Sequence, residues 1–419
     1  MTLGRLVESG IVGGIAPVAV LEGARAVGKT VVGQRLVAAG HYQGYENLAD
    51  PLTRAIAAAD LPGWLASLPD RVVIDEAQLL PDLPLYVKFI VDQPDSTRRF
   101  LLTGSAAIGR TGLGGSDPLT GRVARHRLWP FTKAEAIGRP QHSITVIDDL
   151  LSGAITSTRE YPPFNISELI STGGFPQLAL TQHATGDSDR WVRDTTLGLL
   201  TDDVLPNDRY DLGTAGRVLD ACLREPGAIV NLNSLAQRLT SDPRTVDRYL
   251  DILERRFLVH FLPNLALNPV RQTRTRAKIH PTDTAFAMES IRRANPITGG
   301  EPTHEGKVWE SWIVQQILPG LPYQRGSVNA FFWRDSGIDK NKPHSQRFNE
   351  VDLVLIDGTG HTVGIEVKRC SRVSIDDAGG LFALRKQARL DFGYVIYGGT
   401  TTLRLSDGIY ALPASALWK

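Results

Sequence analysis

PVAVLEGARAVGKT, residues 17–30, is the stretch that decides the fold. A short apolar run ends at Gly23, four residues follow, and Gly28, Lys29 and Thr30 begin a helical pattern. This is the spacing G-x-x-x-x-G-K-[ST], with a strand expected before it and a helix after it. Glycines let backbone N–H groups close around phosphate oxygens, and the helix N-terminus attracts the same negative charge. The stretch therefore predicts a phosphate-binding loop between a strand and a helix.

The loop offers the contacts that a bound ATP and its Mg²⁺ need. We expect the Lys29 ammonium to reach the β- and γ-phosphates and the Thr30 hydroxyl to bind Mg²⁺. The residues expected to surround the nucleotide are Gly23, Ala24, Arg25, Ala26, Val27, Gly28, Lys29 and Thr30. ATP and Mg²⁺ are the predicted ligands of this region.

A second apolar run, RVVIDEAQ, places Val72–Ile74 directly before Asp75 and Glu76. It follows the loop by about 45 residues. A buried parallel strand that ends in two carboxylates is what an ATPase needs beside its phosphate loop. We expect Asp75 to hold Mg²⁺ through water and Glu76 to polarise the attacking water.

A third strand is predicted by RRFLLTGSAA, which ends at Thr103, Gly104 and Ser105. Thr103 and Ser105 are both candidates for contact with the γ-phosphate or with the attacking water, and we favour Ser105. Downstream, TGRVARHRLWPFT supplies Arg122 and Arg125. Either arginine is a candidate for phosphate contact, in the same chain or in a neighbouring subunit; a solvated basic strand is the alternative.

Together these segments resemble a widespread bacterial and archaeal family of AAA-type ATPases. The motifs that carry the resemblance occur in the family's order: GARAVGKT, VVIDEAQ, LLTGS, LTGRVA and GGFPQLAL. The resemblance covers essentially the whole chain and implies a C-terminal region of unknown function. It also implies that the third strand lies between the other two, with its polar end near the γ-phosphate. Ala26 departs from the family, whose members often carry Gln there, but backbone amides do most of that binding.

Composition limits the classes of protein that remain. A chain of 419 residues is longer than one hydrophobic core usually organises, so we expect about two or three domains. The sequence shows no signal peptide and no apolar run of about 20 residues, and two cysteines cannot build a disulfide framework. We therefore expect a cytoplasmic protein that does not bind membranes. With a net charge of +1, any binding of nucleic acid has to be local.

A helix-turn-helix is predicted by NLNSLAQRLTSDPRTVDRYLDILERRFLVHFL, residues 231–262. Its helices are expected at 234–239 and 244–255, and its last residues form the strand of a wing. The buried stripe of the second helix is Val246, Tyr249, Leu250 and Leu253. Its exposed side chains, which could face a DNA groove, are Arg244, Thr245 and Arg248. Asp247 and Asp251 dilute the positive charge, so we favour a structural connector over a DNA reader.

A basic strip follows the predicted wing strand. In VRQTRTRAK the basic residues stand at near-alternate positions: Arg271, Arg274, Arg276 and Lys278. On a strand the last three would share one face, where they would contact phosphate. A solvated edge that charge protects from aggregation is the equally favoured alternative.

A charged hairpin is predicted by NEVDLVLIDGTGHTVGIEVK, residues 349–368. Side chains alternate along a strand, so Asp352 and Glu366 share one face only if the numbers of paired residues have an even sum. Pairing Asp352 with Glu366 places Asp357 opposite His361 across a Gly-containing turn. The same register places Glu350 opposite Lys368 and leaves two carboxylates directly opposed. Like charges at opposed positions are destabilising, so we expect a cation between Asp352 and Glu366. Hard oxygen ligands suit Mg²⁺ or Mn²⁺.

The hairpin resembles the signature of the PD-(D/E)xK nucleases, an Asp followed by E-x-K. Glu310, in the helical stretch EGKVWESWIVQQIL, matches the acidic residue that these enzymes often carry on their first helix. The resemblance implies that Asp352, Glu366 and Glu310 hold a metal ion. It implies that Lys368 orients the attacking water or stabilises the phosphate. DNA or RNA would be the substrate, although the fold also serves to bind nucleic acid without cutting it.

We therefore predict an α/β protein in four parts. These are an AAA-type P-loop ATPase domain (1–140), a helical linker (141–215), a winged helix-turn-helix (216–270) and a restriction-endonuclease-like domain (271–419). The predicted function is ATP hydrolysis coupled to a nuclease-like domain that acts on nucleic acid. The alternative is a nucleotide-dependent switch or scaffold whose C-terminal domain binds nucleic acid or protein without cleavage. A protein-remodelling ATPase is less favoured, since no substrate-threading feature is present; the oligomeric state, a homo-oligomer included, stays open.

Overall fold

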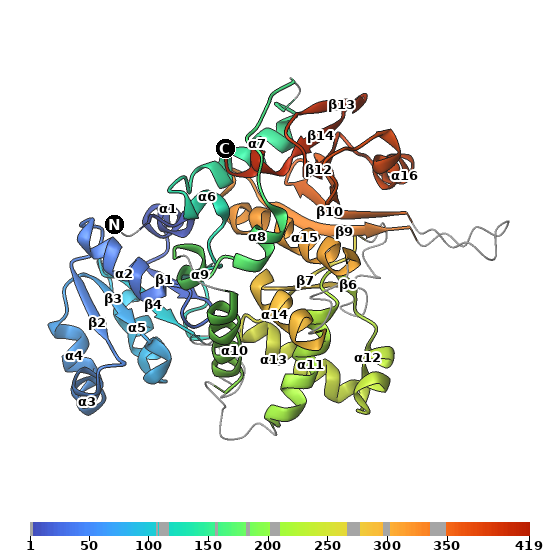
Figure 1. Cartoon of the computed structure of the whole chain (residues 1–419). Coiled ribbons are helices and arrows are strands. Elements are labelled where there is room, and N and C mark those ends of the chain that lie inside the picture. Colours follow the sequence, from blue (N-terminus) through green and yellow to red (C-terminus); the bar gives the residue numbers. More distant parts are fainter. Residues whose placement is uncertain are drawn as a thin grey trace. The chain divides into compact units, whose positions relative to one another are not determined.

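The structure is a computed structural model, and its chain forms two compact units (Figure 1). The first comprises residues 1–130 with 255–257, and the second comprises 131–254 with 258–419. The finer division into four parts stays a prediction. The residues that the structure describes are 3–105, 108, 117–155, 158–181, 185–201, 210–265, 277–295, 302–335 and 349–419.

The first unit contains a five-stranded parallel sheet with the strand order β2-β3-β4-β1-β5. The strands are β1 (Val18–Glu22), β2 (Gly44–Asn47), β3 (Arg71–Asp75), β4 (Arg99–Gly104) and β5 (Val123–Arg127). The expectation that a third strand separates the phosphate-loop strand from the carboxylate strand is confirmed, because β4 lies between β1 and β3. The carboxyl ends of these three strands therefore meet at one edge, where parallel α/β sheets bind ligands.

Helices connect these strands and cover both faces of the sheet. They are α1 (Leu6–Gly13), α2 (Lys29–Ala38), α3 (Pro51–Ala59), α4 (Leu61–Ser67) and α5 (Leu83–Val91), with a 3₁₀ turn η1 (Ala77–Leu79) after β3. On one face, Val20, Ile74 and Leu102 pack in a core with Trp64 of α4 and Val87 of α5. The residues that alternate with them are also buried, among them Leu21, Val73 and Leu101. Burial on both faces explains why the strands read as continuous apolar runs.

The second unit begins with helices and continues into a small sheet. The helices are α6 (Lys133–Ala136), α7 (His142–Ser152), α8 (Ile166–Thr172), α9 (Pro176–Ala179), α10 (Thr185–Thr201), α11 (Leu212–Arg224), α12 (Leu232–Leu239), α13 (Pro243–Arg255) and α14 (Thr284–Ala294). The strands β6 (Ala228–Ile229), β7 (Val259–Leu262) and β8 (Lys278–Pro281) pair antiparallel in the order β6-β8-β7. Within the described ranges, no helix has the length and apolarity that crossing a bilayer requires.

The predicted pair of helices forms close to the predicted limits. The turn between α12 and α13 passes through Thr240, whose φ of 50° is left-handed. The predicted stripe of α13 is buried: Val246, Tyr249, Leu250 and Leu253. The basic strip differs from the prediction, because Lys278 is buried at the start of β8 instead of exposed. Arg271, Arg274 and Arg276 lie outside the described residues.

The C-terminal part of the second unit contains a six-stranded mixed sheet with the order β13-β14-β12-β11-β10-β9. Strands β9, β10 and β11 form an antiparallel meander, whereas β12 runs parallel to β11 and to β14. The elements are α15 (Pro302–Ile317), η4 (Leu318–Tyr323), β9 (Val328–Arg334), β10 (Glu350–Asp357), β11 (Thr362–Lys368), η5 (Ile375–Ala378), α16 (Gly379–Gln387), β12 (Phe392–Tyr397), β13 (Leu403–Ser406), β14 (Ile409–Pro413) and η6 (Ala414–Leu417).

The register of the charged hairpin agrees with the prediction where the ladder runs. Leu353 pairs with Ile365, and the Asp357 N–H donates to the His361 carbonyl at 3.1 Å across the turn. Apolar and charged side chains do not simply alternate along β10, however. A β-bulge against β9 places both Val351 and Val354 in the core beneath α16. The bulge lies between Val351 and Val354, a stretch that includes Asp352, and bulges commonly redirect a side chain beside a functional site.

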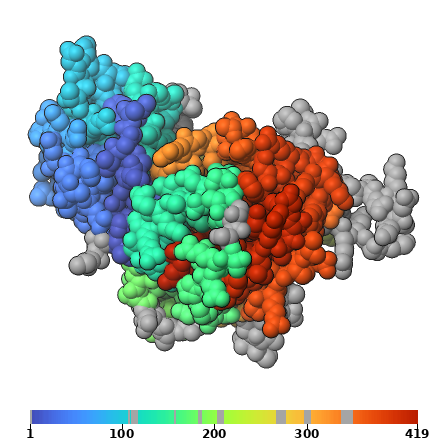
Figure 2. Space-filling view, turned by 90° about the horizontal axis from the view of Figure 1, so that it is seen from above, coloured from blue at the N-terminus to red at the C-terminus, as the bar shows by residue number. Residues whose placement is uncertain are grey.

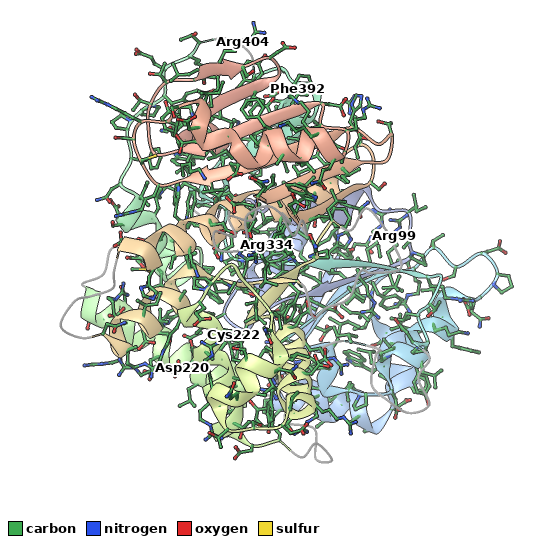
Figure 3. The ribbon with its side chains drawn as sticks, turned by 90° about the vertical axis from the view of Figure 1, so that its right-hand side faces the viewer. Arg99, Asp220, Cys222, Arg334, Phe392 and Arg404 are labelled. Carbon is green, nitrogen blue, oxygen red and sulfur yellow. The ribbon has the colours of Figure 1, made fainter. Side chains whose placement is uncertain are left out.

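Helix α7 packs on the C-terminal sheet, and its residues lie beside the chain's last residues on the surface of the second unit (Figure 2). The Tyr394 hydroxyl of β12 donates to the Leu150 carbonyl at 3.3 Å, and His142 Nε2 lies 2.9 Å from the Ala416 carbonyl oxygen. Phe392, labelled in Figure 3, packs against Gly153 at the end of α7. The predicted linker therefore contributes to the core of the C-terminal sheet.

The GGFP turn between α8 and α9 is held by a buried carboxylate. Asp283, which is fully buried, accepts backbone N–H groups from Gly174 at 2.7 Å, Phe175 at 3.0 Å and Ala285 at 2.8 Å. Gly173 has a φ of +64°, and a Cβ there would lie 1.8 Å from Asp283 Oδ1. Only glycine fits both that conformation and that close approach. The motif therefore wraps around the Asp283 carboxylate.

Candidate functional site

The phosphate loop joins β1 to α2 at the ligand-binding edge of the first sheet. Ala26 and Gly28 adopt left-handed φ values of 62° and 103°. For the alanine this conformation costs about 1–2 kcal/mol, and such strain persists mainly at functional sites. The Lys29 ammonium is buried and donates to the carbonyls of Gly23 and Ala24, each at 2.9 Å. The positive charge is thus held inside the loop, as a phosphate-binding lysine requires.

Asp75 collects three hydroxyl groups at the end of β3. Its Oδ2 accepts from Thr30 Oγ1 at 2.6 Å and from the Tyr45 hydroxyl at 2.7 Å, and its Oδ1 accepts from the Thr103 hydroxyl. Asp75 is only 1% exposed. The structure therefore brings Thr30 and Asp75 together as predicted. A hydroxyl and a carboxylate beside a phosphate loop are hard oxygen donors, and they fit Mg²⁺.

Tyr45 was not predicted as a site residue. It lies on β2, which neighbours β3, and its pKa is raised by burial and then by its hydrogen bond with Asp75. It therefore stays protonated and donates to the carboxylate. Thr103 was considered only for contact with the γ-phosphate or water, yet its hydroxyl also orients Asp75. The strand order, which the sequence does not state, decides that these side chains meet.

Glu76 stands in a left-handed conformation directly after β3, with φ 56° and ψ 42°. Its Oε2 accepts a hydrogen bond of 2.5 Å from Gln78 Nε2, which also lies 3.4 Å from Ser105 Oγ. A Cβ on Gly104 would lie 2.3 Å from Gln78 Oε1. The predicted residues Glu76 and Ser105 are thus linked through Gln78. Gln78 is visible in the sequence DEAQ, but its role depends on its contact with Ser105 at the end of β4, which the sequence does not show.

The link through Gln78 leads to a prediction for the rate of ATP hydrolysis. We expect Gln78→Ala to lower kcat by about 10- to 100-fold with little change in KM, because Glu76 loses the partner that orients it. Steady-state hydrolysis measures both constants. Gln78→Glu serves as a control that keeps the side-chain length while replacing the donor by a repelling carboxylate, and it should be at least as slow. Wild-type kcat in both variants would contradict the positioning role.

Arg122 does not reach the loop of its own chain. It precedes β5, and its carbonyl accepts the N–H of Val18 at the start of β1, whereas the loop follows the end of β1 at Glu22. Four residues of strand separate these edges by about 13 Å. The Arg122 side chain instead pairs with Asp92. These contacts favour the structural alternative for Arg122, and its contact with a nucleotide, in the same chain or in a neighbouring subunit, stays a prediction.

Arg125 and Arg127 are also held by neighbours within the first unit. Arg125 pairs with Glu22 at 2.8 Å and with Asp117. Arg127 is the residue of β5 that lies beside Glu22, and its guanidinium lies 3.6 Å from the centroid of the Trp129 ring. The basic strand is thus a set of partnered side chains, which favours the structural alternative for Arg125.

In the second unit, three carboxylates converge on one ammonium. Lys278 Nζ lies 2.6 Å from Glu310 Oε1, 2.6 Å from Glu350 Oε1 and 3.1 Å from Asp352 Oδ1. Glu310 comes from α15, and the other two come from β10. Burial lowers the pKa of Lys278, but the three carboxylates outweigh it and hold that pKa well above its ordinary value. The lysine is therefore charged.

Glu366 and Lys368 form a second pair beside this cluster. Lys368 Nζ lies 3.2 Å from Glu366 Oε2, and the Val367 N–H between them donates to Asp352 Oδ2 at 2.9 Å. Burial first, and the charge of Asp352 second, raise the pKa of Glu366 and likewise that of Glu310. The structure thus brings the four predicted residues Glu310, Asp352, Glu366 and Lys368 into one region.

A divalent ion does not fit this arrangement. The Lys278 ammonium takes the point on which the carboxylates converge. Over the ranges that the structure describes, no group of three or more His, Cys, Asp or Glu is placed to hold a metal ion. The cation beside Asp352 is a lysine, and Glu366 pairs with a different lysine, Lys368. The metal role of Asp352, Glu366 and Glu310 stays a prediction.

Arg334 borders the cluster and is labelled in Figure 3. It is the last residue of β9, and its Nε lies 3.8 Å from Glu350 Oε2. Strand β9 contacts β7 of the small sheet, with a bridge between Phe332 and Asn264. The C-terminal sheet and the small sheet therefore meet at the cluster, where each contributes charged side chains.

Comparisons with family models match three segments of the chain. Residues 16–137 match the AAA domain. Residues 164–296 and 305–417 match two domains of unknown function, DUF8612 and DUF4143. An uncharacterised protein of Mycobacterium tuberculosis is 28% identical over 411 residues, which are 96% of this chain and 81% of that protein. An uncharacterised protein of Mycobacterium bovis gives the same values.

Solved structures give more distant similarities. A Walker-type ATPase of Pyrococcus abyssi has a TM-score of 0.40 and 15% identity over 69% of this chain and 96% of that chain. The RuvB Holliday junction branch migration motor of Thermotoga maritima has a TM-score of 0.26 and 22% identity over 65% and 88%. The ORC1 protein of Aeropyrum pernix, in complex with DNA, has a TM-score of 0.28 and 15% identity over 71% and 94%. The AAA-domain match, with the parallel sheet and the phosphate loop, identifies residues 16–137 as an AAA-type P-loop ATPase core.

Proposed function

We propose that the chain is an ATP-hydrolysing switch that controls a C-terminal domain which binds nucleic acid without cutting it. The observation that carries the ATPase part is the convergence of Thr30, Tyr45 and Thr103 on Asp75 beside the phosphate loop. Phosphoryl transfer needs positioned charges more than covalent chemistry, and this edge of the sheet supplies them.

Each side chain has a distinct task in this site. Lys29 neutralises the β- and γ-phosphates, and Thr30 with Asp75 would hold Mg²⁺, which supplies further charge neutralisation. Glu76 orients the attacking water and accepts its proton. Gln78 sets the direction of the Glu76 carboxylate through its hydrogen bond and also lies 3.4 Å from Ser105 Oγ. Ser105 would contact the γ-phosphate.

Removal of the loop lysine tests the ATPase part. We expect Lys29→Ala to weaken ATP binding by about 10- to 100-fold and to abolish hydrolysis, because a charge-assisted contact to phosphate is worth about 1.5–3 kcal/mol. Binding of a fluorescent ATP analogue and phosphate release measure the two effects. Lys88→Ala is the matched control, since Lys88 pairs with Asp92 on the surface of α5 and should leave both unchanged. Wild-type hydrolysis by Lys29→Ala would refute the assignment.

The middle of the second unit supports a winged-helix assignment. The order α11-β6-α12-α13-β7-β8 gives three helices and a three-stranded sheet, with a tight turn between α12 and α13. Arg244 and Arg248 are exposed on α13. A helix in this position is the one that enters a DNA groove in helix-turn-helix proteins. We retain the structural connector as the favoured role, because Asp247 lies between these arginines.

The C-terminal sheet supports a nuclease-like assignment. Its core runs α15-β9-β10-β11-α16-β12, and the residues of the predicted signature lie on α15, β10 and β11. Lys278 at the cation position favours binding over cleavage. Control by ATP is tested by nucleic-acid affinity with and without ATP; equal affinities would remove the switch from the proposal.

Metal-dependent cleavage is the second candidate, and the specific observation that favours it is the meeting of Glu310, Asp352, Glu366 and Lys368. The purified chain is incubated with single- and double-stranded DNA and with RNA, in Mg²⁺ or Mn²⁺, beside Lys368→Ala. Cutting that disappears in Lys368→Ala would establish a nuclease. Retention of nucleic acid without cutting is the outcome that our proposal expects.

A further inference from the structure

Lys278 is a buried lysine that neither the ATPase site nor the predicted nuclease signature uses. It is 1% exposed, and a buried ammonium is costly unless it is paired and hydrogen-bonded. Its three carboxylate partners carry more negative charge than it neutralises. The same side chain also lies over the Phe332 ring, with Nζ 5.5 Å from the ring centroid. The Lys278 ammonium is therefore held in one position by the three carboxylates and the Phe332 ring.

The backbone that carries Lys278 is fixed along α15. His280 Nδ1 lies 2.8 Å from Ser311 Oγ, and Gln315 Nε2 donates to the Pro281 carbonyl at 2.7 Å. Strand β8 is also paired on both edges, with β6 and with β7. Lys278 therefore reaches the cluster from an anchored strand.

The geometry of the cluster is that of a cation site. Three oxygens from three carboxylates lie within 3.1 Å of one nitrogen. An ammonium has three protons, one for each of these oxygens. Mg²⁺ and Mn²⁺ prefer the same oxygens at about 2.0–2.2 Å, so a small inward movement would suit either ion. The position admits one cation, and the protein supplies it.

We propose that Lys278 is the resident cation of the site formed by Glu310, Glu350 and Asp352, so that the site is independent of metal and excludes a divalent ion. This inference concerns the same domain to which the proposed function assigns nucleic-acid binding, and it rests on the proposed function in that respect alone. The ammonium provides the positive charge that the three carboxylates would otherwise obtain by binding a metal cation from solution. It also fastens β8 of the small sheet to α15 and β10.

The test is Mn²⁺ binding followed by electron paramagnetic resonance, without ATP or nucleic acid. We expect Lys278→Met to bind Mn²⁺ roughly tenfold or more tightly than the wild type, since three carboxylates then lack their cation. Lys278→Arg, which keeps the charge, should bind Mn²⁺ as the wild type does, and so should Lys88→Ala, which removes a surface lysine of α5 in the first unit. The gain should vanish in the double variant Lys278→Met with Glu310→Gln. Equal Mn²⁺ affinity of Lys278→Met and the wild type overturns the proposal.

A second measurement decides the matter if Lys278→Met does not fold. The melting temperature of the wild type is recorded in Mn²⁺ and in EDTA, beside Glu310→Gln. We expect that Mn²⁺ does not raise the melting temperature through this cluster. A rise in the wild type that is absent in Glu310→Gln would show a metal ion in the cluster and overturn the proposal. ATP hydrolysis and nucleic-acid binding are measured in separate assays. The metal-binding result can therefore be interpreted even if the protein does not hydrolyse ATP or bind nucleic acid.

Discussion

Glu76→Gln is expected to lower kcat for ATP hydrolysis by roughly 10²- to 10⁴-fold while leaving ATP affinity nearly unchanged. The amide keeps the shape of the side chain and its bond from Gln78, but it cannot accept a proton from water. Glu76 lies beyond the phosphate loop, after the strand that carries Asp75, so the contacts that bind phosphate survive. The effect should therefore fall on the chemical step alone.

Phosphate release gives kcat, and a fluorescent ATP analogue gives the dissociation constant for the same sample. Asp70→Asn is the matched control, because Asp70 is an exposed carboxylate directly before the opposite end of β3. It should behave as the wild type in both assays. A weakened affinity in Glu76→Gln with an unchanged rate would mean that Glu76 serves binding rather than hydrolysis.

Asp283→Ala is expected to lower the free energy of unfolding of the second unit by about 3–5 kcal/mol. The substitution leaves the N–H groups of Gly174, Phe175 and Ala285 buried without their acceptor. It also removes the N-cap of α14 and the carboxylate around which the GGFP turn folds. Urea unfolding monitored by tryptophan fluorescence measures the loss.

Asp211→Ala is the matched control for that loss. Asp211 also caps a helix, α11, and accepts the Thr214 N–H, but it does so at the surface. An exposed cap of this kind is worth about 0.5–2 kcal/mol. Similar losses in the two variants would show that Asp283 acts only as a cap and that the GGFP turn does not depend on it.

Local patterns predicted several elements well. The phosphate loop, the two carboxylates after β3 and the buried stripe of α13 follow from spacing and periodicity within about 15 residues. The register of the β10–β11 hairpin followed from one constraint, that Asp352 and Glu366 share a face. Each of these features is decided by neighbours in the sequence, so the sequence states it directly.

Features that depend on packing between distant segments were missed. The position of Arg122 depends on which edge of the parallel sheet it occupies, and a residue before a strand lies at the edge opposite the loop. The bulge between Val351 and Val354 arises from pairing with β9. Lys278 looked like one member of a basic strip, because nothing in RTRAK shows that β8 packs along α15.

The packing of α7 and β8 on the C-terminal sheet decides where the chain can be divided for expression in pieces. A fragment beginning near residue 305, where the last family match starts, would keep Glu310, Glu350 and Asp352 but discard the lysine that neutralises them. It would also expose the surface of β12 that α7 covers. Such a fragment should be prone to aggregation. From the proposal for Lys278, we also expect it to bind divalent metal ions more tightly than the full chain does. Cutting before Phe131 keeps these contacts together.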